Sequence, residues 1–269
     1  MPHFAHNPDD GVELAYDIFD ATSGDPDATP VLLVHGSGLS KAIWRGLGYV
    51  KVLREGRRVI TVDLRGHGRS GKPATQDAYT APTMAADILA VLDAAGAGSV
   101  HYLGYSLGAR LGFGLAVDAP WRLRSFTSLG GTYKIAPGSI GRLFFTGYDD
   151  ALGAGGMPAF VEGWERQSGH RLDPATRAAF LANDAPALRA YFRATEADPA
   201  VPEPEIAAIA VPTLLMAGTA DRARWADSRH AAELIPGSRF VGLPGRDHGT
   251  TLFPPGPVLA EVLPFLAGA

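Results

Sequence analysis

Short apolar runs alternate with amphipathic stretches along most of the chain. The runs are bounded by Gly, Pro and Asp, which is typical of strands that end in turns. Val12–Phe19 alternates apolar and polar positions, as a half-exposed antiparallel strand does, whereas Val31–His35 is continuously apolar, as a strand buried on both faces is. Further strands are expected at Arg58–Asp63, Val100–Leu103, Arg124–Leu129, Pro212–Ala217 and Arg239–Leu243.

Helical periodicity fills the intervals between these runs. Apolar residues recur at helical spacing between Met84 and Ala95, and Gly96 supplies a stop signal. Strands that alternate with helices indicate an α/β fold with a mostly parallel sheet that is covered on both faces. Further helices are expected at Leu107–Val117, Ala226–Ile235 and Val258–Leu266, with Pro264 disturbing the end of the last one.

The alternation fails between about Thr132 and Glu205. This stretch contains no convincing strand, carries many aromatic residues among Gly- and Ala-rich segments, and ends in a proline cluster. We interpret residues 132–205 as a helical cap, inserted into a core that residues 1–131 and 206–269 form. Because ligands of open α/β sheets bind beyond the carboxyl ends of the strands, the cap is expected to wall a pocket there.

Composition narrows the class of protein. The chain is 46% hydrophobic and 19% charged with a net charge of −4, which indicates a globular protein without the basic patch of a nucleic-acid-binding protein. Cysteine is absent, which excludes thiolate catalysis. The sequence contains no apolar signal segment, no run close to the ~20 residues of a membrane span, and no cluster with metal-ligand spacing. We therefore expect a cytoplasmic protein that takes a small-molecule substrate without a metal or organic cofactor; its oligomeric state is not indicated.

The strongest chemical signal is the segment Gly104-Tyr105-Ser106-Leu107-Gly108. A G-x-S-x-G pattern between a strand and a helix forms a sharp turn that lifts the serine hydroxyl above the edge of the sheet. The glycines are required because a Cβ atom would clash in so tight a turn. Ser106 is therefore the candidate nucleophile.

A serine nucleophile needs a neighbouring base and a group that orients the base. Among eight histidines, His248 is the candidate base, because it follows the last expected strand on a loop at the same sheet edge. Asp221 lies just beyond the preceding strand and is the candidate orienting acid. Its competitors are Asp227 and Asp247, and its alternative role is that of a helix N-cap.

A tetrahedral intermediate also needs hydrogen-bond donors at its oxyanion. The backbone N–H of Leu107 is one candidate, since N–H groups at the start of a helix are free and the helix dipole favours an anion there. The N–H of Ser37, in the turn His35-Gly36-Ser37-Gly38, is the second, with an ordinary glycine turn as the alternative. Six further residues could line a substrate pocket, although each also suits a core position: Trp44, Tyr105, Phe144, Met157, Trp164 and Trp225.

The whole chain resembles the α/β-hydrolase superfamily in the order of its motifs. These are H-G-S-G (35–38), D-L-R-G-H-G-R-S (63–70), G-Y-S-L-G (104–108), G-T-A-D (218–221) and D-H-G (247–249). The resemblance implies an α/β-hydrolase fold with a cap, a Ser–His–Asp mechanism that passes through an acyl-enzyme, and a mainly structural role for residues 63–70.

Single positions narrow the choice within that superfamily. Serine at 106 argues against haloalkane dehalogenases and epoxide hydrolases, which place Asp there. Gly249 stands where C–C bond hydrolases usually have Trp, and Leu107 stands where cofactor-free haloperoxidases commonly have Met. We expect a hydrolase of a carboxylic ester, lactone or thioester with a small, largely apolar substrate. The alternatives are a C–C bond hydrolase or lyase with the same triad, and a ligand-binding receptor with a slow triad.

Overall fold

One twisted sheet sets the positions of the other elements. The computed structural model describes residues 3–25, 27–198 and 200–269, and in these ranges eight strands form a sheet in the order β1-β2-β4-β3-β5-β6-β7-β8. The pairs β1–β2 and β2–β4 are antiparallel, and the strands from β4 to β8 are parallel. The predicted α/β class with a mostly parallel sheet is confirmed. The strands are β1 (His3–His6), β2 (Glu13–Phe19), β3 (Val31–Val34), β4 (Val59–Val62), β5 (Val100–Tyr105), β6 (Leu123–Leu129), β7 (Thr213–Gly218) and β8 (Arg239–Leu243).

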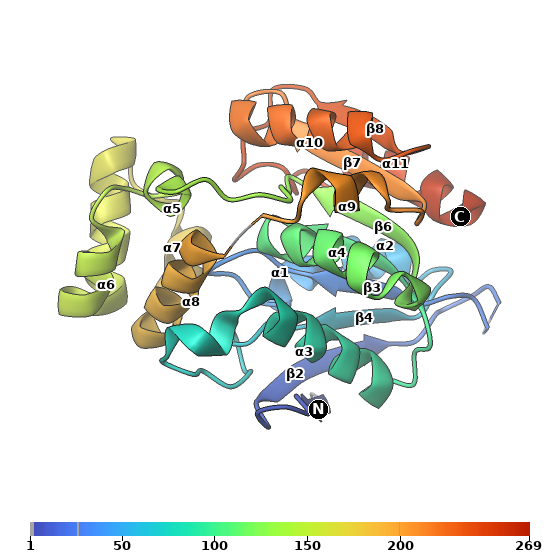
Figure 1. Cartoon of the computed structure of the whole chain (residues 1–269), viewed down its shortest axis with the longest axis horizontal. Coiled ribbons are helices and arrows are strands. Elements are labelled where there is room, and N and C mark those ends of the chain that lie inside the picture. Colours follow the sequence, from blue (N-terminus) through green and yellow to red (C-terminus); the bar gives the residue numbers. More distant parts are fainter. Residues whose placement is uncertain (1–2, 26, 199) are drawn as a thin grey trace.

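Helices cover both faces of the sheet (Figure 1). One face carries α1 (Ala42–Gly46), α2 (Tyr49–Leu53) and α11 (Gly256–Gly268), and the other carries α3 (Ala81–Ala94), α4 (Leu107–Asp118) and α10 (Arg222–Leu234). The helix α11 continues through Pro264, so the expected disturbance at that residue does not end it. Three short helices complete the two layers: η1 (Gln76–Tyr79), η2 (Pro120–Arg122) and α9 (Glu203–Ala207).

Neighbouring residues of a central strand are buried on opposite faces of the sheet. In β3, Leu32 and Val34 belong to the apolar core beneath α3 and α4, while Val31 and Leu33 belong to the core beneath α1, α2 and α11. Side chains alternate across a strand, so a strand that is covered on both faces needs an apolar residue at every position. This double burial explains the continuous apolar run at β3.

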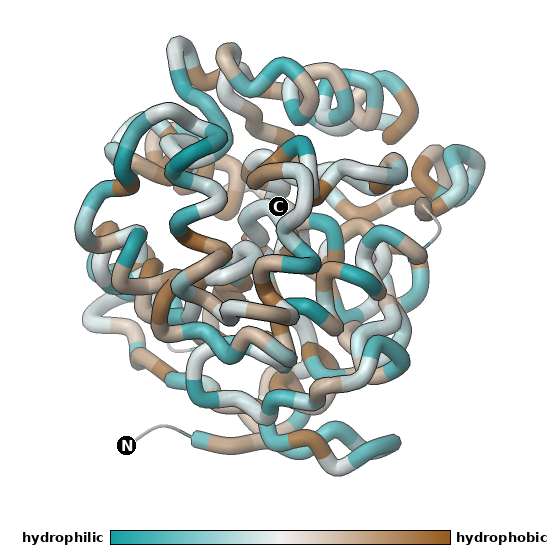
Figure 2. Tube along the Cα trace, turned by 90° about the vertical axis from the view of Figure 1, so that its left-hand side faces the viewer, coloured by the Kyte–Doolittle hydropathy of each residue, from teal (hydrophilic) through white to brown (hydrophobic). Residues whose placement is uncertain are grey.

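Of the five helices between β6 and β7 in the described residues, all but α9 stand beyond one end of the sheet (Figure 1, left). We call α5 (Ser139–Leu143), α6 (Tyr148–Ser168), α7 (Pro174–Leu181) and α8 (Ala185–Ala197) the inserted helices. An aromatic core built on Phe144, Phe160, Phe180 and Phe192 holds them together. In the view onto these helices, hydrophobic stretches are short and interrupted by hydrophilic ones (Figure 2). The division into a core and a cap at residues 131 and 206 stays a prediction.

Within the described ranges, no helix combines the length and the hydropathy that a crossing of the membrane requires.

Candidate catalytic site

Ser106 occupies a backbone conformation that residues with a side chain rarely adopt. Its φ is 53° and its ψ is −109°, and among the described residues other than glycine it alone has a positive φ. The strand β5 ends at Tyr105 and the helix α4 begins at Leu107, so the turn consists of a single residue. The Ser106 N–H donates to the Leu129 carbonyl at 3.0 Å, which anchors the turn to β6. Backbone strain of this kind is concentrated at functional positions.

Two glycines allow the helix after Ser106 to lie directly against the sheet. A Cβ on Gly104 would be 2.5 Å from the Ala109 amide nitrogen, and a Cβ on Gly108 would be 2.7 Å from the Val34 carbonyl carbon. Both distances are shorter than Cβ contacts in proteins, and both neighbours are backbone atoms that cannot rotate away. The glycines of the G-x-S-x-G motif are therefore steric requirements of this turn.

The side chains of Ser106, His248 and Asp221 form a continuous hydrogen-bonded chain. Ser106 Oγ lies 2.9 Å from His248 Nε2, and His248 Nδ1 lies 2.8 Å from Asp221 Oδ2. Because Nδ1 faces a carboxylate, it carries the proton of the neutral ring, and Nε2 is free to accept one. The histidine side chain is 18% exposed and the aspartate side chain 12%, so both are largely shielded from solvent.

Asp221 makes the contacts that both of its predicted alternatives require. Its Oδ1 accepts the Arg224 N–H at 3.3 Å and caps α10, while its Oδ2 contacts the imidazole. Burial opposes ionisation, but the hydrogen bond from His248 leaves the pKa of Asp221 below its ordinary value of 3.8. An ionised carboxylate therefore faces the imidazole at neutral pH. The competitors lie elsewhere, Asp227 within α10 and Asp247 in hydrogen bonds to Thr250.

Tyr105 supports the histidine. Its ring stacks on the His248 ring with the centroids 5.4 Å apart, and its hydroxyl donates to the His248 carbonyl at 2.7 Å. The tyrosine is buried, and these two contacts hold it against the loop that carries His248.

The loop of residues 35–38, which we call the H-G-S-G loop, passes directly over the Ser106 turn. A Cβ on Gly36 would be 2.9 Å from the Tyr105 ring and 3.1 Å from Ser106 Cβ. The Gly108 N–H donates to the His35 carbonyl at 3.1 Å, which ties the loop to α4. In the part of the chain that the structure describes, no acceptor is found for the N–H groups of Ser37 and Leu107. Neither N–H group is therefore committed to a hydrogen bond within the described residues, and their role at an oxyanion stays a prediction.

The remaining predicted pocket residues fall into two groups. Phe144, Met157 and Trp164 pack inside the inserted helices, where the Phe144 and Trp164 rings lie 4.9 Å apart. Trp44 has no exposed surface and packs on Tyr49 beneath the sheet.

Trp225 packs on Phe240 and fills the space beside Gly242 on β8. Because Trp44 and Trp225 serve the packing of the two faces of the sheet, we do not retain them as substrate contacts.

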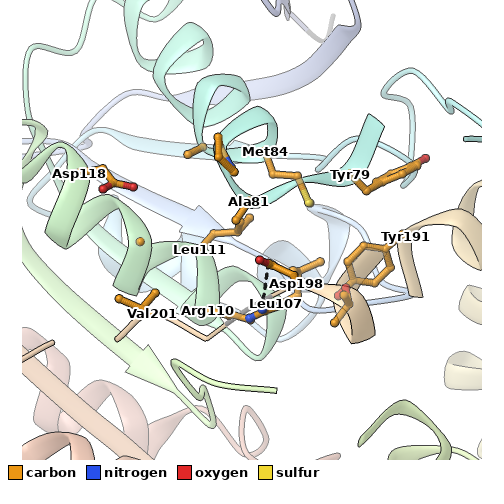
Figure 3. Close-up of a pocket in the computed structure, with 14 residues that line it drawn as sticks. Tyr79, Ala81, Met84, Leu107, Arg110, Leu111, Asp118, Tyr191, Asp198 and Val201 are labelled. Atoms are coloured by element: carbon orange, nitrogen blue, oxygen red, sulfur yellow. Dashed lines mark hydrogen bonds and ion pairs between the residues drawn. The ribbon is translucent and has the colours of Figure 1, made fainter. Parts of the chain in front are cut away.

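A cavity of about 140 Å³ lies between α3, α4 and α8 (Figure 3). Leu107 and Leu111 of α4 form one wall, and Tyr191 of α8 forms another. An ion pair between Arg110 and Asp198, 2.9 Å long, joins α4 to the segment after α8. Sequence reasoning did not single out Tyr191, because its surroundings come from distant helices and it belongs to no motif. Among the described residues, no group of three or more His, Asp or Glu side chains is placed to hold a metal ion.

The chain belongs to the alpha/beta hydrolase fold family, whose family model matches residues 29–184. Rhodomycin D methylesterase DauP of Streptomyces sp. (strain C5) is 30% identical over an alignment 278 positions long, which covers 89% of this chain and 91% of the relative. A relative from Azorhizobium caulinodans named as the carbamate hydrolase RutD is 37% identical over 144 residues, or 54% of this chain. That match spans about half of the relative's own length, 49%.

Solved structures agree with this assignment of the fold. A hydrolase from Pseudomonas aeruginosa is similar with a TM-score of 0.82 and 27% identity, and the match covers 98% of both chains. The enol-lactonase from Burkholderia xenovorans is similar with a TM-score of 0.82 and 24% identity, and the match covers 98% of this chain and 100% of that one.

Proposed function

We propose that this protein is a serine hydrolase that cleaves a carboxylic ester, lactone or thioester of a small, largely apolar substrate. The observation that carries this proposal is the chain of hydrogen bonds from Ser106 through His248 to Asp221, with lengths of 2.9 and 2.8 Å. The name of a relative that aligns over most of its length, a methylesterase, supports the class of bond. A nucleophile, a base and an orienting acid in this geometry are what acyl transfer requires.

Acylation begins when Ser106 Oγ attacks the substrate carbonyl carbon and His248 Nε2 takes the hydroxyl proton. Asp221 stabilises the imidazolium that forms. The carbonyl oxygen becomes an oxyanion, which accepts hydrogen bonds from the N–H groups of Leu107 and Ser37. The intermediate then expels the alcohol, whose oxygen receives the proton from His248 Nε2, and the acyl group stays on Ser106.

Deacylation repeats these steps with water. His248 Nε2 removes a proton from water as its oxygen attacks the acyl carbon, and the same two N–H groups stabilise the second oxyanion. Its collapse breaks the bond to Ser106 Oγ, returns the proton to the serine and releases the carboxylic acid. No step in this cycle uses a metal or organic cofactor.

The preference for an apolar substrate follows from the side chains beside the H-G-S-G loop. The Phe180 ring contacts this loop at Gly38, and the rings of Phe144 and Trp164 lie behind it at 5.8 and 4.9 Å between centroids. Met157 is buried in the same aromatic core. These rings give the inserted helices an apolar interior behind the loop, and Leu107 and Leu111 add apolar groups in the neighbouring cavity, which together favour an uncharged acyl or alcohol moiety.

Replacement of the serine tests the proposal. Ser106→Ala should lower kcat for p-nitrophenyl acetate and butyrate by more than about 1000-fold, while the melting temperature stays near that of the wild type. A fluorophosphonate probe should label the wild type and not this variant. Ser168→Ala, which changes an exposed serine at the end of α6, is the control and should be labelled and active.

Undiminished ester hydrolysis by Ser106→Ala would remove this serine from the mechanism. Labelling of Ser106 with a single acyl release and no turnover would instead indicate a ligand-binding receptor, and cleavage of vinylogous diketo acids or hydroxynitriles in place of esters would indicate a C–C bond hydrolase or a lyase.

A further inference from the structure

The inserted helices contact the H-G-S-G loop at successive residues. The hydroxyls of Tyr191 and Ser37 share a hydrogen bond of 2.9 Å, and the Asn183 side-chain amide donates to the Gly38 carbonyl at 2.8 Å. A Cβ on Gly38 would lie 2.7 Å from the Phe180 ring, so the loop and this ring are closely packed. Two polar anchors and one apolar contact therefore hold the loop from the side of α7 and α8.

The same loop is held on its other side by the Ser106 turn. Gly36 packs on Tyr105 and Ser106, and the His35 carbonyl accepts the Gly108 N–H. The Ser37 N–H thus belongs to a short segment between two bodies that are formed by distant parts of the chain. Its position relative to Ser106 depends on both sets of contacts.

Tyr191 is well suited to act as a fixed anchor. It is 3% exposed, and its ring makes edge contacts with His67 and Tyr79 at 5.7 and 6.1 Å between centroids. Burial raises the pKa of Tyr191, so its hydroxyl is neutral and available for the hydrogen bond to Ser37. The Tyr191 ring and Leu107 line the same cavity (Figure 3), so Tyr191 lies near this proposed oxyanion donor as well as in contact with Ser37.

We propose that Tyr191 and Asn183 are positioning residues for the oxyanion hole, and that the inserted helices thereby contribute to transition-state stabilisation as well as enclosing the substrate. This inference rests on the proposed serine-hydrolase function. A donor stabilises the oxyanion only when it lies about 2.7–3.1 Å from the position that the oxyanion will occupy. A misplacement of about 1 Å can cost on the order of 100-fold in rate. A loop released from its anchors would lose part of this alignment.

The effect should fall on the transition state, because the Ser37 N–H gains its strongest acceptor only when the carbonyl becomes an oxyanion. Loss of such an interaction lowers kcat and kcat/KM together and leaves KM nearly unchanged. A purely structural role, or a role in binding the ground state of the substrate, would leave kcat unchanged or raise KM.

The test compares Tyr191→Phe and Asn183→Ala with Tyr133→Phe. Tyr133 is the matched control, because it is also buried and its hydroxyl donates to Glu203 at 2.8 Å, outside the contacts of the H-G-S-G loop. With p-nitrophenyl butyrate, kcat should fall roughly 10- to 100-fold in the first two variants and stay within about 2-fold of the wild type in the control. An alkylboronic acid, which forms a tetrahedral adduct on an active serine, should bind more weakly by a similar factor.

A double variant adds a second readout. In a Ser37→Ala background, which keeps the backbone N–H but removes the hydroxyl, Tyr191→Phe should cause no further loss. The proposal is overturned if Tyr191→Phe keeps full kcat, if it raises only KM, or if its effect multiplies fully with that of Ser37→Ala. These outcomes differ from failure of the proposed function itself, in which Ser106→Ala retains its hydrolysis.

Discussion

Alanine substitution of three glycines in α4 tests how this helix is fitted against the sheet. Gly108, Gly112 and Gly114 share one helix but differ in surroundings. A Cβ on Gly108 would be 2.7 Å from the Val34 carbonyl carbon, and one on Gly112 would be 2.7 Å from the Tyr102 ring. A Cβ on Gly114 would meet nothing within 4 Å. An added methyl group would therefore meet rigid backbone at Gly108, an aromatic side chain at Gly112 and open space at Gly114.

The expected changes in the free energy of unfolding follow from these distances. An ordinary contact begins near 3.4 Å, so at Gly108 the helix must retreat by more than half an ångström from a strand that the sheet holds in place. Overpacking of this kind destabilises the fold by about 1–3 kcal/mol, whereas the higher helix propensity of Ala over Gly stabilises it by about 0.5–1 kcal/mol. Gly108→Ala should therefore destabilise the protein by about 2 kcal/mol, Gly112→Ala by about 1 kcal/mol, and Gly114→Ala should stabilise it by up to ~1 kcal/mol.

Thermal unfolding and ester hydrolysis measured together give the test. For a domain of this size, 1 kcal/mol shifts the melting temperature by about 2–4 °C, so the Gly108 and Gly114 variants should differ by about 6–12 °C. Gly108→Ala should also lower kcat at least ~10-fold, because a shift of α4 moves Ser106 and the Leu107 N–H. The reasoning is refuted if Gly108→Ala melts with the wild type, or if Gly114→Ala is destabilised as much as Gly108→Ala.

Two further predictions concern the supports of the site. Asp63→Asn breaks a buried pair with Lys41, whose nitrogen lies 2.7 Å from the carboxylate, and should cost about 3 kcal/mol at pH 7. Burial opposes ionisation of Asp63, but its neighbour His35 and the hydrogen bonds from Lys41 lower its pKa. The ionised Asp63 carboxylate therefore stabilises the fold above pH 3.8, and this stabilisation is lost only below that pH. In urea titrations, the free energies of unfolding of Asp63→Asn and wild type should become equal below pH 3.8 and differ at higher pH. Tyr105→Phe leaves the His248 carbonyl without its donor, so the free energy of unfolding should fall by about 1 kcal/mol and kcat should fall several-fold. An unchanged kcat in steady-state assays would show that the stacked ring alone orients the histidine.

The elements that the sequence predicted best are those with a strong periodic signal. The seven expected strands occur as β2 to β8, with ends that differ by a residue or two. The strand β1 was missed because only one of its four residues is buried, so the hydrophobic pattern is weak. The helices α1 and α2 were missed because five residues are too few to show helical periodicity.

The chain order of the motifs likewise suggested which serine, histidine and aspartate would meet, and Ser106 and Asp221 each lie within hydrogen-bond distance of His248. Aromatic residues could not be assigned in the same way. Trp44, Phe144 and Trp225 are all large aromatic residues that the sequence does not distinguish. In the structure they pack beneath the sheet, inside the inserted helices and beside β8, respectively. A large apolar side chain satisfies any of these environments, and only the packing of distant elements selects one.

The sequence by itself determined the strand order along the chain, the strained turn at Ser106 and the residue types available for catalysis. Each of these depends on local sterics and on the period of side chains along a strand or helix. The tertiary structure alone decided that Tyr191 and Asn183 reach the H-G-S-G loop, because these contacts join residues that are about 150 positions apart. Such pairings follow from how the inserted helices pack on the sheet, and no local pattern encodes them.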